Sequence, residues 1–446
     1  MPEPRLRVGL LLHVPTASFT LEGPFDLRVD GGAPTPVPAG TTLTARAERG
    51  IRVEDASHVT LAEGRSVRLD PKASGATFVV RGFRVGAAFH WEHAEDLRFT
   101  GGIDLVAADD GLDLVNEVPL ERYVESVICS EMSPTSPEAS LRAHAIISRS
   151  WMLAQLAAPR SAARPKEPVT DGPLVRRILW YDRQDHDGFD VCADDHCQRY
   201  QGVTRAVGGA PAEAVRATRG LALVHGGEVC DARFSKCCGG ATEVFSTCWG
   251  DEDRPYLQAF ADRPGDGFVP LDDEGRARAH VLGDPHAWCN TADRTLLEHI
   301  LPTIDHGTRD FWRWTVTLTQ EEARELVRTR SGIDTGPIRA LTPLRRGPSG
   351  RISLLEIEGR DRTLHLGKEL EIRRVLSTTH LYSSAFVVSP EGTGNTPDRF
   401  VLRGAGWGHG VGLCQIGAAV MAAHGHDHEA ILAHYYRGAT LEPLYS

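Results

Sequence analysis

The sequence predicts an α+β protein with more than one folding unit, and three observations carry this prediction. The chain has 446 residues, more than one hydrophobic core usually accommodates. Short segments of alternating apolar and polar residues, separated by Gly, Asp and Pro, fill residues 1–115 and predict a β-rich N-terminal part. A long apolar stretch of helical character follows from residue 138, and alternating segments return after residue 350.

Composition, charge and hydropathy argue against a nucleic-acid-binding protein and against a membrane-spanning one. Hydrophobic residues make up 41% and charged residues 24% of the chain, a balance typical of folded globular proteins. The formal net charge of −11 argues against a nucleic-acid partner, because neutralising phosphates requires an excess of clustered Lys and Arg. The apolar run at residues 8–14 is far shorter than the roughly 20 residues of a spanning helix, and no small-residue cleavage site follows it. We therefore expect a buried first strand there, with no transmembrane helix and no visible signal peptide.

A buried helix is predicted in the middle of the chain. Ser136 can cap it, Pro137 suits its first turn, and Glu138 complements the positive end of the helix dipole. Residues 140–157 are apolar on most faces, so this helix should be buried. The stretch that follows, residues 158–173, holds four prolines and many charges, which predicts an exposed loop.

A β-rich insertion domain is predicted at residues 262–398, between residues 116–261 and residues 399–446 of one core. Within it, residues 320–330 have the pattern of an amphipathic helix ending at Gly332, and two alternating strands follow.

The C-terminal part begins with a Gly-rich stretch at residues 404–412 that leads into a helix of small residues. Such glycines let the backbone approach a ligand or a neighbouring strand. They are not a nucleotide-binding fingerprint, because no βαβ unit surrounds them. The histidines of residues 424–430 are predicted to lie on the surface, and a last helix should stop at Gly438.

Cysteine and histidine cluster in one short stretch. The chain has nine cysteines, an odd number, and His186, Cys192, His196 and Cys197 fall close together. Thiolates beside imidazoles are the ligand set that selects Zn²⁺. The gap between the two cysteines is at the edge of zinc-finger spacing, so a chance cluster or a Cys192–Cys197 disulfide remains the alternative.

Glu131 is the candidate general acid. It follows an apolar run at residues 127–129 and precedes a turn bounded by prolines, so its carboxyl should be partly desolvated. Desolvation favours the protonated form, which a general acid needs at neutral pH. On these features alone, a helix cap or a surface charge is the simpler explanation.

Four stretches resemble the SpoIID/LytB sporulation-protein-D family. Residues 116–153 match its PLE-Y-V--V--SEM pattern and the helix that follows, and residues 185–202 match ICDT-HCQVY-G. Residues 214–257 match a stretch that ends in TE---VWG---PYL, and residues 404–441 match the closing G-G-GHGVGMSQ-GA pattern. The matching residues include Pro119, Glu121, Tyr123, Ser130, Glu131, Met132, Arg149, Gly239, Gly240, Glu243, Gly408, His409, Gly410 and Gln415.

The resemblance implies roles for individual residues. In the family, the Glu of the SEM motif is the catalytic acid/base, and Glu131 occupies its position. Some members bind zinc through one His and two Cys, which implies a structural Zn²⁺ held by His186, Cys192 and Cys197. His196 would then line the cleft or replace His186 as a ligand. The predicted substrate contacts are Arg149, His196, Lys236, Cys238, His409 and Gln415, of which Lys236 and Cys238 stand where the chain departs from the family pattern.

The chain departs from the family pattern at two places. Residues 235–238 read Ser-Lys-Cys-Cys where the family has His-Ser-Thr-Ser, and Cys414 stands at the usual Ser. Cys237 or Cys238 then either completes the zinc shell, pairs with Cys248, or lines the cleft as a small weakly polar group.

The activity implied by the resemblance is that of a peptidoglycan lytic transglycosylase acting on peptide-free glycan strands. A hydrolytic glycosidase usually needs two carboxylates, whereas the sequence offers one Glu and no obvious second partner. Glu131 would protonate the oxygen between N-acetylmuramic acid and N-acetylglucosamine and then deprotonate the C6 hydroxyl, which closes a 1,6-anhydro ring. Lys236 either orients Glu131, binds a carboxylate, or is a solvated surface charge.

Two other functions are compatible with the sequence. The LytB branch of the family is described as enhancing a partner amidase, so the chain is alternatively a glycan-binding regulator of a cell-wall amidase. A zinc hydrolase built on His186, Cys192 and Cys197 would need an open metal position and a nearby base. A cell-wall substrate implies a location in the cell envelope, periplasmic or extracellular.

Overall fold

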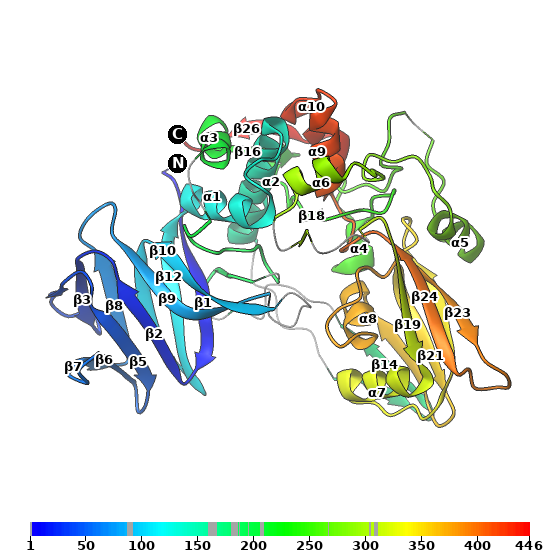
Figure 1. The fold of residues 1–446 in the computed structure, drawn as a ribbon, viewed down its shortest axis with the longest axis horizontal. Helices are drawn as coiled ribbons and strands as arrows, with labels where there is room; N and C mark the ends of the chain where they lie inside the picture. Colours follow the sequence, from blue (N-terminus) through cyan, green and yellow to red (C-terminus); the bar gives the residue numbers. More distant parts are fainter. Residues whose placement is uncertain are drawn as a thin grey trace.

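Two β-rich lobes flank a helical layer that joins them at one end in the computed structural model (Figure 1). The mixture of helices and sheets confirms the α+β class. Among the residues described, no helix has the length and apolar character needed to cross a membrane. The structure describes residues 2–86, 92–158, 167–179, 186, 188–194, 196–205, 209–265, 267–302, 305–306 and 311–446.

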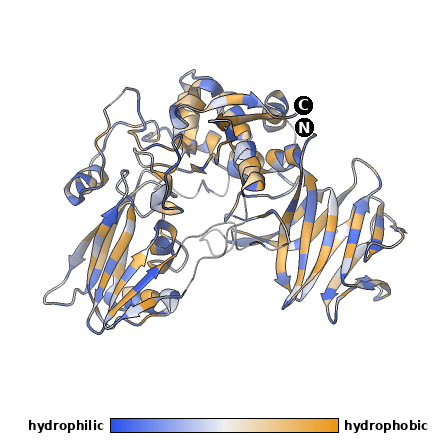
Figure 2. Cartoon of the chain, turned by 180° about the vertical axis from the view of Figure 1, so that it is seen from behind, coloured by the Kyte–Doolittle hydropathy of each residue, from blue (hydrophilic) through white to orange (hydrophobic). Residues whose placement is uncertain are grey.

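The N-terminal lobe packs two sheets face to face, in the strand orders β15-β1-β12-β11-β8-β3-β4 and β10-β9-β2-β5-β6-β7. Hydrophilic and hydrophobic residues alternate along these strands (Figure 2), so each sheet turns one face to the core and one to solvent. The predicted first strand is β1. The strands are β1 (Arg5–Val14), β2 (Thr16–Leu21), β3 (Phe25–Val29), β4 (Thr35–Val37), β5 (Thr42–Ala47), β6 (Ile51–Asp55), β7 (Thr60–Gly64), β8 (Ser66–Pro71), β9 (Thr77–Val85), β10 (His93–Thr100), β11 (Gly102–Ala108), β12 (Gly111–Pro119) and β15 (Val191–Cys192).

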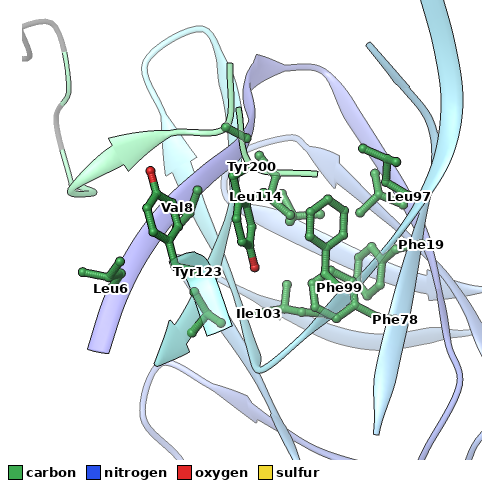
Figure 3. Close-up of a cluster of buried hydrophobic side chains, with 14 of the residues drawn as sticks. Leu6, Val8, Phe19, Phe78, Leu97, Phe99, Ile103, Leu114, Tyr123 and Tyr200 are labelled. Atoms are coloured by element: carbon green, nitrogen blue, oxygen red, sulfur yellow. The ribbon is translucent and has the colours of Figure 1, made fainter. Parts of the chain in front are cut away.

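A row of aromatic rings runs through the core of this lobe toward the helical layer (Figure 3). The ring centroids of Phe78 and Phe99 lie 5.6 Å apart, and those of Phe99 and Tyr200 lie 5.7 Å apart. Tyr200 stacks in turn on Tyr123 at 5.2 Å and donates a hydrogen bond of 2.6 Å to the side-chain oxygen of Asn116. Buried aromatic pairs of this kind stabilise beyond their buried area. They fix the segment around Tyr200 against the first helix of the chain.

The helical layer holds two small sheets, β17-β16-β26 and β18-β25, among its helices. The long helix α2 is buried along most of its length, as predicted. In β18-β25, Phe234 pairs with Leu413 in parallel orientation. The elements are α1 (Leu120–Glu131), α2 (Glu138–Ala157), α3 (Ala210–Ala217), β16 (Leu221–His225), β17 (Glu228–Val229), β18 (Phe234–Ser235), α4 (Phe245–Cys248), β25 (Leu413–Cys414), α9 (Gln415–Ala423), α10 (His428–Tyr435) and β26 (Thr440–Pro443).

The cap predicted for α2 is wrong. Pro137 occupies the N-cap position, and no side chain caps the helix there. The Ser136 hydroxyl instead donates to the carbonyl of Ile300 at 3.2 Å. Because the Ser136 hydroxyl bonds to a segment that is distant in sequence, it does not cap the helix as the local sequence predicts.

The second of the two β-rich lobes, on the far side of the helical layer (Figure 1), is called the third lobe. It contains the sheets β13-β14-β22-β21-β20 and β19-β24-β23. Helix α7 begins at a capping box formed by Thr319 and Glu322 and ends at Gly332, close to its predicted limits. The elements are β13 (Val169–Asp171), β14 (Leu174–Ile178), α5 (Glu274–Leu282), β19 (Arg313–Thr319), α7 (Gln320–Ser331), β20 (Ile338–Arg346), β21 (Ile352–Gly359), β22 (Thr363–Gly367), α8 (Glu369–Val375), β23 (Phe386–Glu391) and β24 (Arg399–Ala405). Helix α6 (Arg294–Ile300) lies between α5 and β19 in the sequence but packs against α9 of the helical layer (Figure 1).

The predicted loop at residues 158–173 needs a correction. Its residues 169–171 form β13, an exposed strand that pairs with β14, and residues 159–166 lie outside the described residues. Strand β14 pairs in parallel with β22, so the chain before residue 179 already supplies a strand to the third lobe.

Candidate active site

A cleft of about 380 Å³ is lined by residues of the helical layer and of the third lobe. Helices α1 and α2 and strand β18 supply one wall, and α8 with the segment after it supplies another. Five of the residues predicted to act on or bind substrate line it together: Glu131, His196, Lys236, His409 and Gln415.

Glu131 is the last residue of α1 and is 8% exposed. Its carboxylate oxygen Oε1 accepts a hydrogen bond of 3.3 Å from the backbone N–H of Arg199. Arg199 directly precedes Tyr200, so the aromatic row of the N-terminal lobe fixes the donor that orients this carboxyl. Sequence motifs did not identify Arg199, because its contribution is a backbone group.

Lys236 is buried and binds the helix that carries Glu131. Its ammonium donates to the backbone carbonyl of Glu131 at 3.3 Å and forms an ion pair of 2.9 Å with Asp305. A cation at the C-terminal end of a helix is favoured by the helix dipole. Of the predicted alternatives, the solvated surface charge is excluded, because Lys236 is 7% exposed. The ion pair joins the helical layer to the segment that follows α6.

His409 is a neutral member of the cleft wall. Burial and the nearby charges of Arg233 and Arg351 hold its pKa well below the usual value. Its Nδ1 accepts a hydrogen bond of 3.0 Å from the backbone N–H of Val411, and its ring lies 4.7 Å from that of Trp249. His409 therefore shapes the cleft beside an aromatic side chain.

Gln415 reaches the cleft from the start of α9 and is held by a histidine that sequence reasoning missed. Its side-chain nitrogen lies 3.0 Å from Nε2 of His144 on α2, and the Ser148 hydroxyl lies 3.2 Å from Nδ1 of the same ring. The only sequence signal for His144 was a histidine within an apolar helix. That signal does not reveal its partner Gln415, which lies far away in the sequence.

We expect acid to destabilise the fold through His144. Burial, helped by the charge of Lys236, lowers the pKa of His144 from 6.5 to about 3. The folded state therefore disfavours the protonated ring, and its stability falls as the pH drops below the unfolded pKa. Between pH 7 and pH 5 the loss should be about 2 kcal/mol. Urea unfolding of wild type and His144→Gln at both pH values measures the loss of unfolding free energy that is due to His144. Equal losses in the two proteins would contradict this prediction.

Arg149 does not belong to the cleft, which corrects its predicted role. It is fully buried, and its guanidinium donates to both carboxylate oxygens of Glu121 at 2.9 and 2.8 Å. A further hydrogen bond reaches the carbonyl of Leu221 at 3.0 Å. Glu121 also accepts from Gly220 and from the hydroxyl of Tyr445. This network joins α1, α2 and β16 and leaves Arg149 no group for substrate.

The predicted metal ligands come together. One donor atom each of His186, Cys192, His196 and Cys197 lies within 4.8 Å of the other three. Nε2 of His186 lies 3.1 Å from Sγ of Cys197. Both cysteines are free thiols, so the alternative of a Cys192–Cys197 disulfide is wrong. His196 is exposed, lines the cleft and is also the fourth donor of this group, which we call the loop cluster.

Cys238 lies outside both the loop cluster and the cleft lining, which corrects its predicted contact with substrate. Its Sγ is buried at 3.1 Å from Asp262 Oδ2 and 3.5 Å from Sγ of Cys289. Neither Cys237 nor Cys238 pairs with Cys248, because all three are free thiols. Of these three cysteines, Cys248 is the one that lines the cleft.

Arg351 of the third lobe holds two backbone segments behind the cleft, and no sequence motif identified it. It is fully buried, and its guanidinium donates to the carbonyl of Cys238 at 3.2 Å and of Gly408 at 3.1 Å. Gly410 has a φ of +74°, and a Cβ there would approach the Arg351 guanidinium carbon to 2.4 Å. Glycine at this position allows the close approach of the arginine.

Two family models match parts of this chain. Residues 108–225 match the family model described as Stage II sporulation protein, and residues 243–412 match a Domain of unknown function (DUF8618). The first match covers α1, α2 and the loop cluster, and the second covers most of the third lobe. These matches relate the chain to the SpoIID/LytB family.

Curated relatives are similar at low identity. Stage II sporulation protein D of Bacillus amyloliquefaciens is 25% identical over 329 residues, which cover 73% of this chain and 75% of that protein. An uncharacterized protein of Brachyspira hyodysenteriae is 25% identical over 345 residues, 77% of this chain and 72% of that protein. Amidase enhancer of Bacillus subtilis is 25% identical over 241 residues, 51% of this chain but 32% of that protein.

Proposed function

We propose that this protein is a peptidoglycan lytic transglycosylase in which Glu131 is the acid/base. The observation that carries the proposal is the Glu131 carboxyl, which lines a cleft, is mostly buried and is oriented by a backbone N–H. Relatives named Stage II sporulation protein D support a role at the cell wall. Such a substrate requires the protein to work in the cell envelope.

The surroundings of Glu131 favour chemistry with one carboxylate. Glu369 also lines the cleft but is 1% exposed, and its two oxygens accept hydrogen bonds from Ser384 at 3.3 Å and Arg373 at 3.4 Å. Asp194, the other acidic residue of the lining, has interactions of its own. A hydrolytic glycosidase needs a second carboxylate as nucleophile or base. Glu369 is engaged with protein groups and is poorly suited to that role.

The proposed reaction uses the two protonation states of Glu131 in turn. Protonated Glu131 donates its proton to the oxygen between N-acetylmuramic acid and N-acetylglucosamine, and the bond from muramoyl C1 to that oxygen breaks. The resulting carboxylate takes the proton of the muramoyl C6 hydroxyl as its oxygen bonds to C1. The 1,6-anhydro ring closes, Glu131 regains its proton, and no water is consumed. Trp249 and Trp407 line the same cleft, where aromatic side chains can contribute apolar contacts to a bound glycan.

We propose that the loop cluster holds a structural Zn²⁺. Two thiolates and two imidazoles are the donor set of closed tetrahedral zinc sites, and the four donors here are mutually close enough to bind one ion. Bound zinc would cross-link the segment of residues 186–197 through its side chains. Cys192 lies in β15, which pairs with β1, so the ligands would anchor the segment leading to Arg199 on the N-terminal sheet. A zinc hydrolase is less well supported, because four protein ligands leave no open position for water.

Removal of this metal is expected to lower stability. An ion that binds only the folded state contributes about 3 kcal/mol at a free concentration one hundred times its dissociation constant. Thermal unfolding with and without a chelator should therefore show a lower midpoint after chelation. The shift should be smaller in Cys192→Ser/Cys197→Ser than in Cys129→Ser, whose cysteine lies outside the loop cluster. An unchanged midpoint in wild type would contradict a structural metal.

The direct test is product analysis of peptide-free glycan strands incubated with the full chain. Mass spectrometry should find 1,6-anhydro-muramoyl ends and no new reducing ends. New reducing ends would indicate hydrolysis and overturn the proposal. Strands that are bound but left intact would favour a different function.

That second candidate is a glycan-binding enhancer of a cell-wall amidase, and the similarity to Amidase enhancer favours it. In this case the chain should raise the rate at which a cell-wall amidase cleaves peptidoglycan, while producing no anhydro ends itself. An amidase assay with and without the chain separates the two functions.

A further inference from the structure

A second group of metal-binding side chains lies in the core of the helical layer, apart from the loop cluster. Donor atoms of Cys238, Asp262, Cys289 and Cys414 all lie within 4.8 Å of one another. Each of the four residues is at most 3% exposed. None belongs to the cleft lining. We call this group the core cluster.

We infer that the core cluster is a second metal site, which binds one tetrahedral ion through three thiolates and a carboxylate oxygen. The spacing fits a single ion. Zinc–sulfur bonds of about 2.3 Å place sulfurs about 3.8 Å apart at the corners of a tetrahedron, and the sulfurs of Cys238 and Cys289 are 3.5 Å apart. A disulfide would need about 2.0 Å. All three cysteines are free thiols.

Neighbouring groups orient these ligands as they do in metal sites. Oδ1 of Asp262 accepts the hydroxyl hydrogen of Tyr435 at 2.9 Å and lies 3.1 Å from Nε2 of His434, which leaves Oδ2 toward the thiols. Sγ of Cys414 accepts from the backbone N–H of Cys238 at 3.2 Å and from another at the start of α9. Hydrogen bonds of this kind hold carboxylate and thiolate ligands in place around a metal.

The packing around the core cluster has no room for a larger side chain. A Cβ on Gly417 would approach the Tyr435 hydroxyl to 2.3 Å and Oδ2 of Asp262 to 2.7 Å.

Three buried thiols beside a buried carboxyl are a poor substitute for an apolar core, because a buried charge needs a partner. His434 and Tyr435 contact the carboxyl of Asp262, and a bound cation would balance the charge of the ligand thiolates as well. Three sulfur donors select Zn²⁺ and similar ions over Mg²⁺ or Ca²⁺, which prefer oxygen.

The ion would tie together four distant segments behind the cleft. Cys238 follows Lys236 by two residues, and Cys414 directly precedes Gln415, so two ligands flank cleft residues. Cys289 lies between α5 and α6, upstream of Asp305, the ion-pair partner of Lys236. The proposed site is structural and would hold the wall that carries Lys236 and Gln415.

Metal counting on the full chain tests this inference. Protein purified in the presence of a thiol reductant, with no metal added, would be analysed by inductively coupled plasma mass spectrometry. The informative variant is Cys192→Ser/Cys197→Ser, in which the core cluster is intact. We expect it to retain one zinc per chain, as Cys129→Ser should at this site. Cobalt substituted into the same variant should give the absorption of a tetrahedral thiolate-bound ion.

Substitution of two ligands of the core cluster provides a second, complementary measurement of metal content. Cys238→Ser/Cys289→Ser should lose one equivalent of metal relative to wild type. If that variant fails to fold, the count in Cys192→Ser/Cys197→Ser still decides. A metal-free Cys192→Ser/Cys197→Ser protein that remains folded would overturn the inference. A wild-type protein with a Cys238–Cys289 disulfide, seen as an intact mass about two daltons lower, would also overturn it.

Discussion

Glu131→Gln is expected to abolish glycan cleavage while leaving the fold intact. Glutamine keeps the size of the side chain and its oxygen can still accept from the Arg199 N–H, but it cannot deliver a proton or take one up. Loss of a positioned acid/base costs about 10²- to 10⁴-fold in rate, and Glu131 is proposed to act in both steps. The measurement is the initial rate of anhydro-end formation, with circular dichroism to check the fold.

Glu125→Gln is the matched control for this variant. Glu125 lies on the same helix and pairs with Arg122 at the surface, away from the cleft lining. It should retain wild-type cleavage. If Glu131→Gln kept more than about a tenth of the wild-type rate, Glu131 would not be the acid/base.

Arg149→Met is expected to lower the free energy of unfolding by about 3–5 kcal/mol, because it leaves the buried Glu121 carboxylate without its partner. Burial raises the pKa of Glu121, but the hydrogen bonds and charge of Arg149 outweigh it, so the pKa is lowered overall. A lowered pKa adds stability above the unfolded pKa of about 4.5, and this contribution is lost as the pH falls. The difference between wild type and variant should therefore shrink from pH 7 to pH 4. Urea unfolding at both pH values measures it.

Two further variants test the cause. Glu121→Gln/Arg149→Met should recover part of the stability, because it removes the uncompensated charge. Arg142→Met, on the same helix, removes a surface pair with Glu138 and should cost less than about 1 kcal/mol. A role for Arg149 in substrate binding alone would instead appear as lost activity at unchanged stability.

The sequence was most informative where chemistry and spacing are local. The motif around Glu131 and the short Cys/His stretch identified residues that do lie beside the cleft, because neighbours in sequence are neighbours in the fold there. The capping box at Thr319 and the glycine at Gly332 gave the limits of α7 for the same reason. Whether Glu131 is catalytic stays a prediction.

Long-range contacts account for what sequence reasoning missed. A family match does not say whether a matching arginine contacts substrate or a buried carboxylate, which is why Arg149 was misassigned. Cys238, Asp262, Cys289 and Cys414 are too far apart in the chain to form a recognisable spacing. Partners from distant parts of the chain, such as Arg351 and Asp305, have no local signal.

The parallel pairing of β18 with β25 determines when during synthesis the cleft can form. Its partners Phe234 and Leu413 are far apart in the chain, whereas strands β1 to β12 of the N-terminal lobe are contiguous in sequence. A growing polypeptide can collapse that sandwich early, since domains generally fold as units during translation. The wall that carries Lys236 must wait until residue 414 has emerged from the ribosome, so ribosome-bound chains should have a folded first lobe and no completed cleft.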